Sequence, residues 1–282
     1  MTVRWPAEAI WEAVSPQWPS FSVEVLPEID STNTELMRRA RAGQTDPVLL
    51  VAESQTAGRG RLGRPWHGKT GDALTFSLGL MLAPQDWSGL SLAVGLSLAR
   101  SLDPDGALGV QLKWPNDVWV ARPGSSTGWG KLAGILIETA VATGQAAAPK
   151  AQAWGEAPPA GARYCVIGVG LNIAPPVAQG LSTEPLGLQD LVPDITAPQS
   201  LRRVAQPLLA TVLAFETHGA NGGFASLQNA FNARDALRDV TVTLSDGRIG
   251  IARGVDATGA LRVETAQGLE VINSSEVSVR PQ

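Results

Sequence analysis

Six short apolar stretches restrict the fold of this 282-residue chain more than any other feature of its sequence. Each is bounded by turn or helix signals, which is the pattern of a strand buried in a sheet. Helix-forming patterns lie between some of these stretches, at residues 36–40 and 90–102, and on either side of the set, at residues 7–14 and 200–217. The strands are expected at residues 23–26, 48–52, 73–80, 110–113, 132–137 and 166–173. This alternation predicts an α+β fold, a mixed sheet with helices.

The pattern changes at Val240, where short alternating runs follow one another with Asp246-Gly247 and Thr258-Gly259 as turn signals. They predict a small β-barrel. We therefore expect two domains, residues 1–237 and 238–282. Residues 139–162 are rich in Ala, Pro, Gly and Gln, and we expect them to form an exposed insertion.

Charge and cysteine content exclude several functions. A net charge of −4 argues against a general nucleic-acid binder, which needs a basic face. The only cysteine, Cys165, excludes internal disulfides, and two distant histidines give no support to a zinc site. No stretch of about 18 apolar residues predicts a membrane span or an export signal. A cytoplasmic protein without membrane contact is expected.

The segment Gly58-Arg59-Gly60-Arg61-Leu62-Gly63-Arg64-Pro65-Trp66, called the glycine-rich loop below, carries the strongest chemical signal. Its glycines permit close backbone approach, and its three arginines supply fixed positive charge. Its glycine spacing matches a dinucleotide-binding fingerprint, but the apolar helix that must follow is missing. The composition instead predicts a site for a carboxylate or a phosphate, with a solvated surface loop as the alternative.

Four further polar groups are ambiguous when each is considered alone. Ser31-Thr32-Asn33 has the composition of a helix cap, and Gln55 has no distinguishing context. Asn116 and Asp117 lie in a proline-containing turn, which is commonly structural. Lys131 precedes an apolar strand, where it can either face an anion or mark a wet strand end.

Taken in order, these motifs resemble those of the biotin protein ligases. The resemblance covers most of residues 20–175, and the last 45 residues look like the small C-terminal domain of that family. The motifs that carry it are Asp30-Ser31-Thr32-Asn33, Gln55 with the glycine-rich loop, Lys113-Trp114-Pro115-Asn116-Asp117, Lys131-Leu132-Ala133-Gly134-Ile135 and Gly168-Val169-Gly170-Leu171-Asn172.

The resemblance implies a two-step reaction with ATP, biotin and Mg²⁺. The biotin carboxylate attacks the α-phosphate and releases pyrophosphate; a lysine of a biotin carboxyl carrier domain, such as that of acetyl-CoA carboxylase, then captures the biotinyl group. The residues implied to bind biotin are Ser31, Thr32, Asn33, Gln55, Arg59, Gly60, Arg61 and Lys131. Those implied for ATP are Gly58, Arg64, Trp66, Asn116, Asp117 and Asn172. Those implied in catalysis are Lys131, Arg61 and Asp117.

Several of these assignments leave alternatives open. Trp66 can stack on adenine or belong to the core. Asp117 can hold Mg²⁺ or orient the incoming amine, and its division of labour with Asn116 is open. The loop's glycines predict mobility and ordering on ligand binding.

The sequence departs from the family in two respects. Only about 30 residues precede Ser31, too few for the DNA-binding domain that some members carry, so a ligase without repressor activity is expected. Residues 122–130 and 140–162 are longer connections than usual. Some family members form homodimers, and the sequence leaves this possibility open.

Two other functions compete with the biotin ligase. A lipoate or octanoate ligase shares the fold, but a plain acyl chain would leave Ser31, Thr32, Asn33 and Gln55 without hydrogen-bond partners. A non-catalytic biotin-binding module would not require Lys131, Asp117 and the arginines. Both alternatives are therefore less favoured than the ligase.

Overall fold

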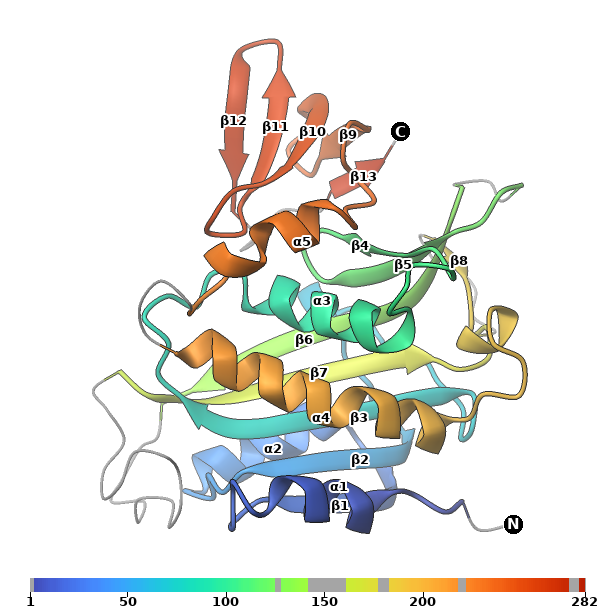
Figure 1. Cartoon of the computed structure of the whole chain (residues 1–282), viewed down its shortest axis with the longest axis vertical. Helices are drawn as coiled ribbons and strands as arrows, with labels where there is room; N and C mark the ends of the chain where they lie inside the picture. Colours follow the sequence, from blue (N-terminus) through green and yellow to red (C-terminus); the bar gives the residue numbers. More distant parts are fainter. Residues whose placement is uncertain are drawn as a thin grey trace. The chain divides into compact units, whose positions relative to one another are not determined.

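The computed structural model describes residues 3–124, 128–141, 161–176, 183–217, 222–273 and 279–281 (Figure 1). The chain forms two compact units. Unit 1 contains residues 1–83 and 122–207, and unit 2 contains residues 84–121 and 208–282. The predicted insertion at 140–162 lies mostly outside the described residues, as do residues 125–127.

Unit 1 is built on a mixed sheet that carries the predicted biotin-binding residues. Its strand order is β1 (Ser22–Ile29), β2 (Val48–Gln55), β3 (Ala73–Leu82), β7 (Arg163–Asn172) and β6 (Trp129–Ala140). Strands β1 and β2 are parallel, whereas β2–β3, β3–β7 and β7–β6 are antiparallel. The short β8 (Glu184–Pro185) pairs with the start of β6. Every residue of β3 is buried, as its continuous apolar run predicted.

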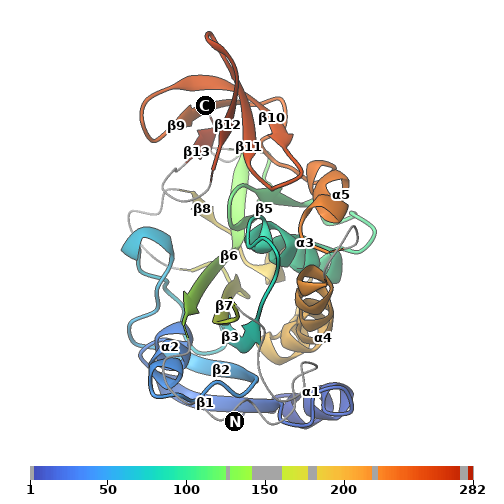
Figure 2. The ribbon, with the colours of Figure 1, turned by 90° about the vertical axis from the view of Figure 1, so that its left-hand side faces the viewer.

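Helices α1 (Ala7–Val14) and α2 (Thr32–Arg41) lie on opposite faces of this sheet (Figures 1 and 2). Helix α2 begins at its cap Ser31, whose Oγ accepts the N–H of Thr34. Its apolar side packs against β2, β3 and β7 through Leu36, Met37 and Ala40. The first turn of α2 therefore lies on the same face of the sheet as Ser77, a residue of the candidate site described below. A further helix, α4 (Ala197–Glu216), begins after the 3₁₀ turn η2 (Leu188–Asp190).

Unit 2 contains a helix, a hairpin and the C-terminal sheet. Helix α3 (Leu90–Leu102) precedes the antiparallel pair β4 (Val110–Lys113) and β5 (Asp117–Ala121). The 3₁₀ turn η3 (Ala225–Leu227) and helix α5 (Gln228–Asn232) precede five antiparallel strands. Their spatial order is β12 (Gly268–Ile272), β11 (Leu261–Thr265), β10 (Ile249–Val255), β9 (Thr241–Leu244) and β13 (Val279–Pro281).

The structure confirms the predicted α+β class and the change to a small all-β region near residue 240. The division into domains at residue 237 stays a proposal. Strands β5 and β13 and helix α5 were not predicted, because each is only three to five residues long. Within the described part of the chain, no helix is both long and apolar enough to cross a membrane.

Cys165 lies on β7 and is fully buried. Burial in apolar surroundings raises the pKa of its thiol, because the thiolate is poorly solvated there. Its position in the centre of the sheet makes it a core residue and a poor nucleophile.

Asp235, a buried residue of unit 2, gives a pH-dependent prediction. Its Oδ1 accepts the N–H of Leu237 at 2.9 Å, while its Oδ2 has no partner within the described residues. Desolvation raises the pKa of this carboxyl from 3.8 to about 6. Because the folded-state pKa is the higher one, ionisation destabilises the fold progressively as the pH rises from 3.8 to about 6, and the full cost is present above that range.

We therefore expect Asp235→Asn to increase the free energy of unfolding by roughly 1–3 kcal/mol at pH 7.5, because it removes the buried charge and keeps the acceptor for Leu237. The gain should nearly vanish at pH 4. Urea unfolding at both pH values measures it, and an equal gain at both would contradict the role of ionisation.

Candidate active site

Three glycines lie together on one face of the unit 1 sheet, and the strip of backbone that they leave without side chains is called the glycine trough below. Gly170 on β7 pairs with Thr75 on one side and with Gly134 on the other. Gly168 pairs with Ser77 in the neighbouring row. Directly paired residues of adjacent strands point to the same face, so these five residues share one face. Because glycine has no Cβ, other side chains can approach the backbone closely at this place.

The first turn of α2 and the end of β2 form a buried polar cluster at one end of this trough. The backbone N–H of Thr32 donates to Oε1 of Gln55 at 2.8 Å, and the Thr32 hydroxyl lies 3.2 Å from the same oxygen. Ser77 contributes a hydroxyl 2.7 Å from that of Thr32. Ser31, Thr32 and Ser77 are all buried. The cluster therefore offers hydroxyl and amide groups on a fixed backbone, the kind of surface that binds a polar ring.

Asn33 completes this polar cluster. Its side chain lies directly over Gly168, where a Cβ would come within 2.0 Å of Asn33 Oδ1. Oδ1 accepts the hydroxyl of Ser77 at 2.6 Å, and Nδ2 donates to the carbonyl of Leu136 and to Oε2 of Glu138. All of its polar atoms are thus engaged, and the side chain is held in one orientation.

The glycine-rich loop, residues 58–66, folds back on itself. Its backbone is joined by bonds from Trp66 N to Gly58 O at 2.8 Å and from Gly60 N to Arg64 O at 2.7 Å. The tip is the 3₁₀ turn η1 (Arg61–Gly63), in which Leu62 has a positive φ of 56° and an exposed side chain. A left-handed leucine with little packing is strained. The tip is therefore the part of the loop most easily rearranged.

Trp66, at the end of this loop, places its indole in the glycine trough. A Cβ on Gly170 would lie 2.3 Å from its Cε2, and one on Gly134 would lie 3.1 Å from its Cζ3. The indole Nε1 is buried and has no hydrogen-bond partner within the described residues. A small cavity between Trp66, Gln55 and Thr75 has no room for a water-sized molecule. A ligand can enter this part of the trough only if the indole moves, and the unsatisfied N–H lowers the cost of moving it.

Lys131 lies beside Trp66, with its Nζ 5.7 Å from the centre of the indole ring. The same Nζ would be 3.3 Å from a Cβ on Gly134. The backbone of Lys131 is fixed because its carbonyl accepts Nδ2 of the buried Asn172 at 3.0 Å. Asn172 thus fixes the main chain of Lys131, and the side chain brings Nζ beside Trp66 over Gly134.

The arginines of the loop differ in their surroundings. Arg59 is half exposed, and its guanidinium lies 3.4 Å from Oε1 of Glu138 and 3.4 Å from Oγ1 of Thr34. Arg61 begins the turn at the tip, and Arg64 is exposed. The three positive charges therefore lie on the same glycine-rich segment as Trp66.

Asn116 and Asp117 belong to unit 2. They follow the buried Trp114, whose indole donates to the carbonyl of Gly259 at 3.0 Å, and Asp117 pairs with Lys113 at the turn end of the β4–β5 hairpin. Lys113 Nζ lies 5.6 Å from the ring centre of Trp119. This turn is therefore a well-anchored part of unit 2, and its roles at the nucleotide remain predictions.

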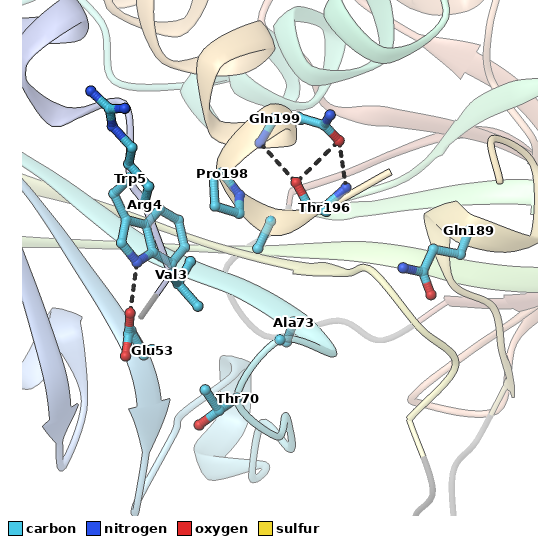
Figure 3. A pocket seen from close by; sticks show the side chains of 12 residues that line it. Val3, Arg4, Trp5, Glu53, Thr70, Ala73, Gln189, Thr196, Pro198 and Gln199 are labelled. Carbon is cyan, nitrogen blue, oxygen red and sulfur yellow. Dashed lines mark hydrogen bonds between the residues drawn. The ribbon is translucent and has the colours of Figure 1, made fainter. Parts of the chain in front are cut away.

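A larger cavity of about 410 Å³ lies in unit 1 (Figure 3). The N-terminal segment forms one wall, where Trp5 Nε1 donates to Oε1 of Glu53 at 2.8 Å. Glu53 and Ala73 also line the small cavity beneath Trp66, so the two cavities share a wall. The N-terminal segment thus supports the end of β2 that carries Gln55.

The sequence analysis missed Ser77 and Glu138 and gave no role to the individual glycines of the trough. A signal for Ser77 was present, since Thr75, Ser77 and Gly79 alternate with large apolar residues along one strand. Gly168 and Gly170 repeat the same spacing on β7. Nothing local distinguished Glu138 from an ordinary polar residue at the end of an apolar run.

The comparisons with known proteins agree with this geometry. The sequence pattern of the biotin/lipoate A/B protein ligase family matches residues 25–148, and that of the biotin protein ligase C-terminal domain matches residues 238–280. The biotin–[acetyl-CoA-carboxylase] ligase of Mycobacterium tuberculosis is 34% identical over 90% of this chain and 88% of its own length. The bifunctional ligase/repressor BirA of Salmonella typhimurium is 33% identical over 95% and 78%.

A solved structure shares the fold. The biotin protein ligase of Aquifex aeolicus in complex with biotin and ATP superposes with a TM-score of 0.72, at 23% identity over 92% of this chain and 99% of that one. The identity to the Mycobacterium and Salmonella proteins extends over most of this chain and over most of each relative, and it establishes the family relationship. The chain belongs to the biotin protein ligase family.

Proposed function

We propose that this chain activates biotin with ATP to form biotinyl-5′-AMP and pyrophosphate, and then transfers biotin to a lysine of a carrier domain. The observation that carries the proposal is the trough itself, which has the buried Thr32 bonded to Gln55 at one end and the cation of Lys131 beside Trp66. A ligand with a polar ring at one end and a carboxylate at the other has the matching distribution of groups. Biotin is such a molecule.

The first step brings the biotin carboxylate and a phosphate together and builds negative charge on the phosphoryl oxygens. Fixed cations and backbone donors that face this charge lower the barrier. Lys131 would supply one of these cations, because its Nζ lies beside Trp66 and over Gly134. Arg61 would add a second charge from the loop, and Gly60 would allow the backbone to approach the ligand closely.

Trp66 would leave the trough and support the adenine when ATP binds. Its unsatisfied indole N–H and its position at the end of a loop with a strained tip are consistent with that movement. The polar cluster would keep its place because hydrogen bonds already fix it: Ser31, Thr32 and Gln55 would bond the ureido group, and Asn33 would support that turn at the biotin site.

Mg²⁺ would enter with the nucleotide. The described residues contain no group of three His, Cys, Asp or Glu side chains that could hold a metal ion by themselves. Mg²⁺ in nucleotide sites is commonly held by one or two carboxylates together with phosphate oxygens. Asp117 with Asn116 is the set proposed here, so the ion would depend on ATP for most of its ligands.

The acceptor would be the carrier domain of a biotin-dependent carboxylase, such as acetyl-CoA carboxylase. Its lysine amine must be neutral to attack the adenylate, and Asp117 is proposed to orient it. A cytoplasmic location and the absence of operator binding are proposed from the sequence; the net charge of −4 supports the latter. A homodimer stays a possibility to be measured in solution.

Selective stabilisation by biotin tests the proposed substrate against a lipoate or octanoate substrate. Biotin is expected to raise Tm, whereas lipoate and octanoate should leave it nearly unchanged, because an acyl chain cannot pair with Thr32 and Gln55. A larger shift with lipoate would favour the lipoate ligase. Pyrophosphate release on addition of biotin and Mg·ATP separates the enzyme from a non-catalytic biotin-binding module.

The glycine-rich loop provides a prediction about ordering. Limited trypsin digestion between Arg59 and Arg64 is expected to slow at least tenfold when biotin and Mg·ATP are added, because the strained tip would then be held over the ligand. Cleavage at other exposed sites, such as Arg100 on α3, serves as the internal control. Equal protection at both places, or none at either, would contradict local closure.

A further inference from the structure

Glu138 lies between two parts of the proposed biotin site. It is located on β6, and its Oε2 accepts Nδ2 of Asn33 at 3.0 Å. Its other oxygen, Oε1, faces Arg59 of the glycine-rich loop at 3.4 Å. One carboxylate therefore joins the fixed first turn of α2 to the loop that would close over the ligand.

The contacts form a line of decreasing burial from the sheet to the loop. Ser77 is 0% exposed and donates to Asn33, which is 4% exposed and donates to Glu138. The Glu138 side chain is 23% exposed and the Arg59 side chain 48%. The inner contacts are short and fixed, whereas the outer one is long and open to solvent. Such a pair breaks easily, because exposed ion pairs contribute little stability.

Arg59 attaches the loop to the rest of unit 1 through its side chain. The backbone bonds within the loop, Trp66 to Gly58 and Gly60 to Arg64, join it only to itself. Arg59 instead reaches across to Glu138 and to Oγ1 of Thr34 on α2. A contact of this kind controls how long the loop stays closed. It takes no part in the chemical step itself.

We propose that Glu138 is a positioning residue that holds Arg59, and with it the glycine-rich loop, over the biotin end of the site. This proposal rests on the proposed ligase function. The Glu138–Arg59 pair, called the latch below, would act on the kinetics. It retains the adenylate until the acceptor lysine arrives, while the adenylation step depends on other cations. Arg59 then acts as the closing contact of the loop as well as a positive charge near the ligand.

Glu138→Gln tests the latch, because the glutamine oxygen can still accept from Asn33 while the charge that attracts Arg59 is lost. The enzyme is loaded with biotin and Mg·ATP, freed of excess ligand, and the escape of biotinyl-5′-AMP is timed without acceptor. We expect about three- to fivefold faster escape in the variant. The single-turnover rate of pyrophosphate release should change less than twofold.

Arg59→Gln and the double variant separate the latch from a structural role. If Glu138 acts only through Arg59, biotinyl-5′-AMP escapes from the double variant no faster than from Arg59→Gln alone. Salt should accelerate escape from the unmodified protein and have little effect on Glu138→Gln, since screening weakens an exposed ion pair. The proposal would be overturned if the two substitutions multiplied each other's effect on the escape rate. Equal salt dependence of escape in the unmodified protein and in Glu138→Gln would also overturn it.

The outcomes also distinguish the latch from the proposed function. If the unmodified chain forms no adenylate, the ligase function itself fails. If it forms adenylate and the variants release it at the same rate as the unmodified protein, only the latch fails. Should Glu138→Gln lose the fold, as judged by its thermal transition, Arg59→Gln on the exposed loop still gives the decisive comparison.

Discussion

Lys131→Ala is expected to slow adenylate formation by a factor on the order of 10² to 10³, the usual effect of removing one well-placed donor from an electrostatic site. The fold should persist. Lys131 Nζ is held beside Trp66 over the glycine trough, and its backbone is fixed by Asn172. A cation at a fixed position needs little rearrangement as charge develops on the phosphate, so its loss should lower the rate constant more than the affinity for biotin.

Single-turnover pyrophosphate release measures this effect, and thermal unfolding checks the fold. Lys131→Met should behave in the same way, since it keeps the apolar stem against Trp66 and removes only the charge. The matched control is Arg41→Ala, which removes an exposed cation from the far end of α2. An unchanged rate in Lys131→Ala, or an equal loss in Arg41→Ala, would reject the assigned role.

Gly168→Ala and Gly170→Ala are expected to damage the binding of different ligands, although they make the same change two residues apart on β7. A Cβ on Gly168 would meet Oδ1 of Asn33 at 2.0 Å, and one on Gly170 would meet the Trp66 indole at 2.3 Å. Neither glycine has a positive φ, so the effect comes from these contacts alone. The first should weaken biotin and the second ATP.

We expect Gly168→Ala to weaken biotin at least tenfold, because Asn33 cannot move without losing its bonds to Ser77 and Glu138. Gly170→Ala should raise the KM for ATP at least tenfold, since the added methyl group would narrow the part of the trough that the nucleotide enters once the indole has left. Biotin titration calorimetry and the KM for ATP separate the two. Variants that affect the same ligand equally would contradict the division of the trough into a biotin end and a nucleotide end.

The local elements of the fold were predictable from the sequence because each carries its own signal. Helices α1 and α3 have the predicted limits, since Pro16 and the apolar run at 90–102 define them locally. Ser31 was recognisable as a helix cap for the same reason. Strand β5 was missed because its five residues follow a turn and are stabilised by pairing with β4, which no local pattern reports.

The candidate site was predictable where its residues form ordered motifs, and not where pairing across the sheet creates it. Gln55 and Thr32 could be named from the sequence, but the bond between them joins positions 23 residues apart. The trough depends on the register that sets Gly170 between Thr75 and Gly134. Glu138 gains its significance from Asn33 and Arg59, which are 105 and 79 residues away in the sequence. Such contacts are products of the fold.

The central claim is that this chain attaches biotin to a carrier protein through an adenylate. The most direct test incubates the protein with biotin, Mg·ATP and the carrier domain of an acetyl-CoA carboxylase, and then measures the intact mass of the carrier and maps the modified residue. The account predicts one biotinyl group on a single lysine and none when ATP is left out. A carrier of unchanged mass, with biotin bound to the protein but no pyrophosphate released, would contradict it.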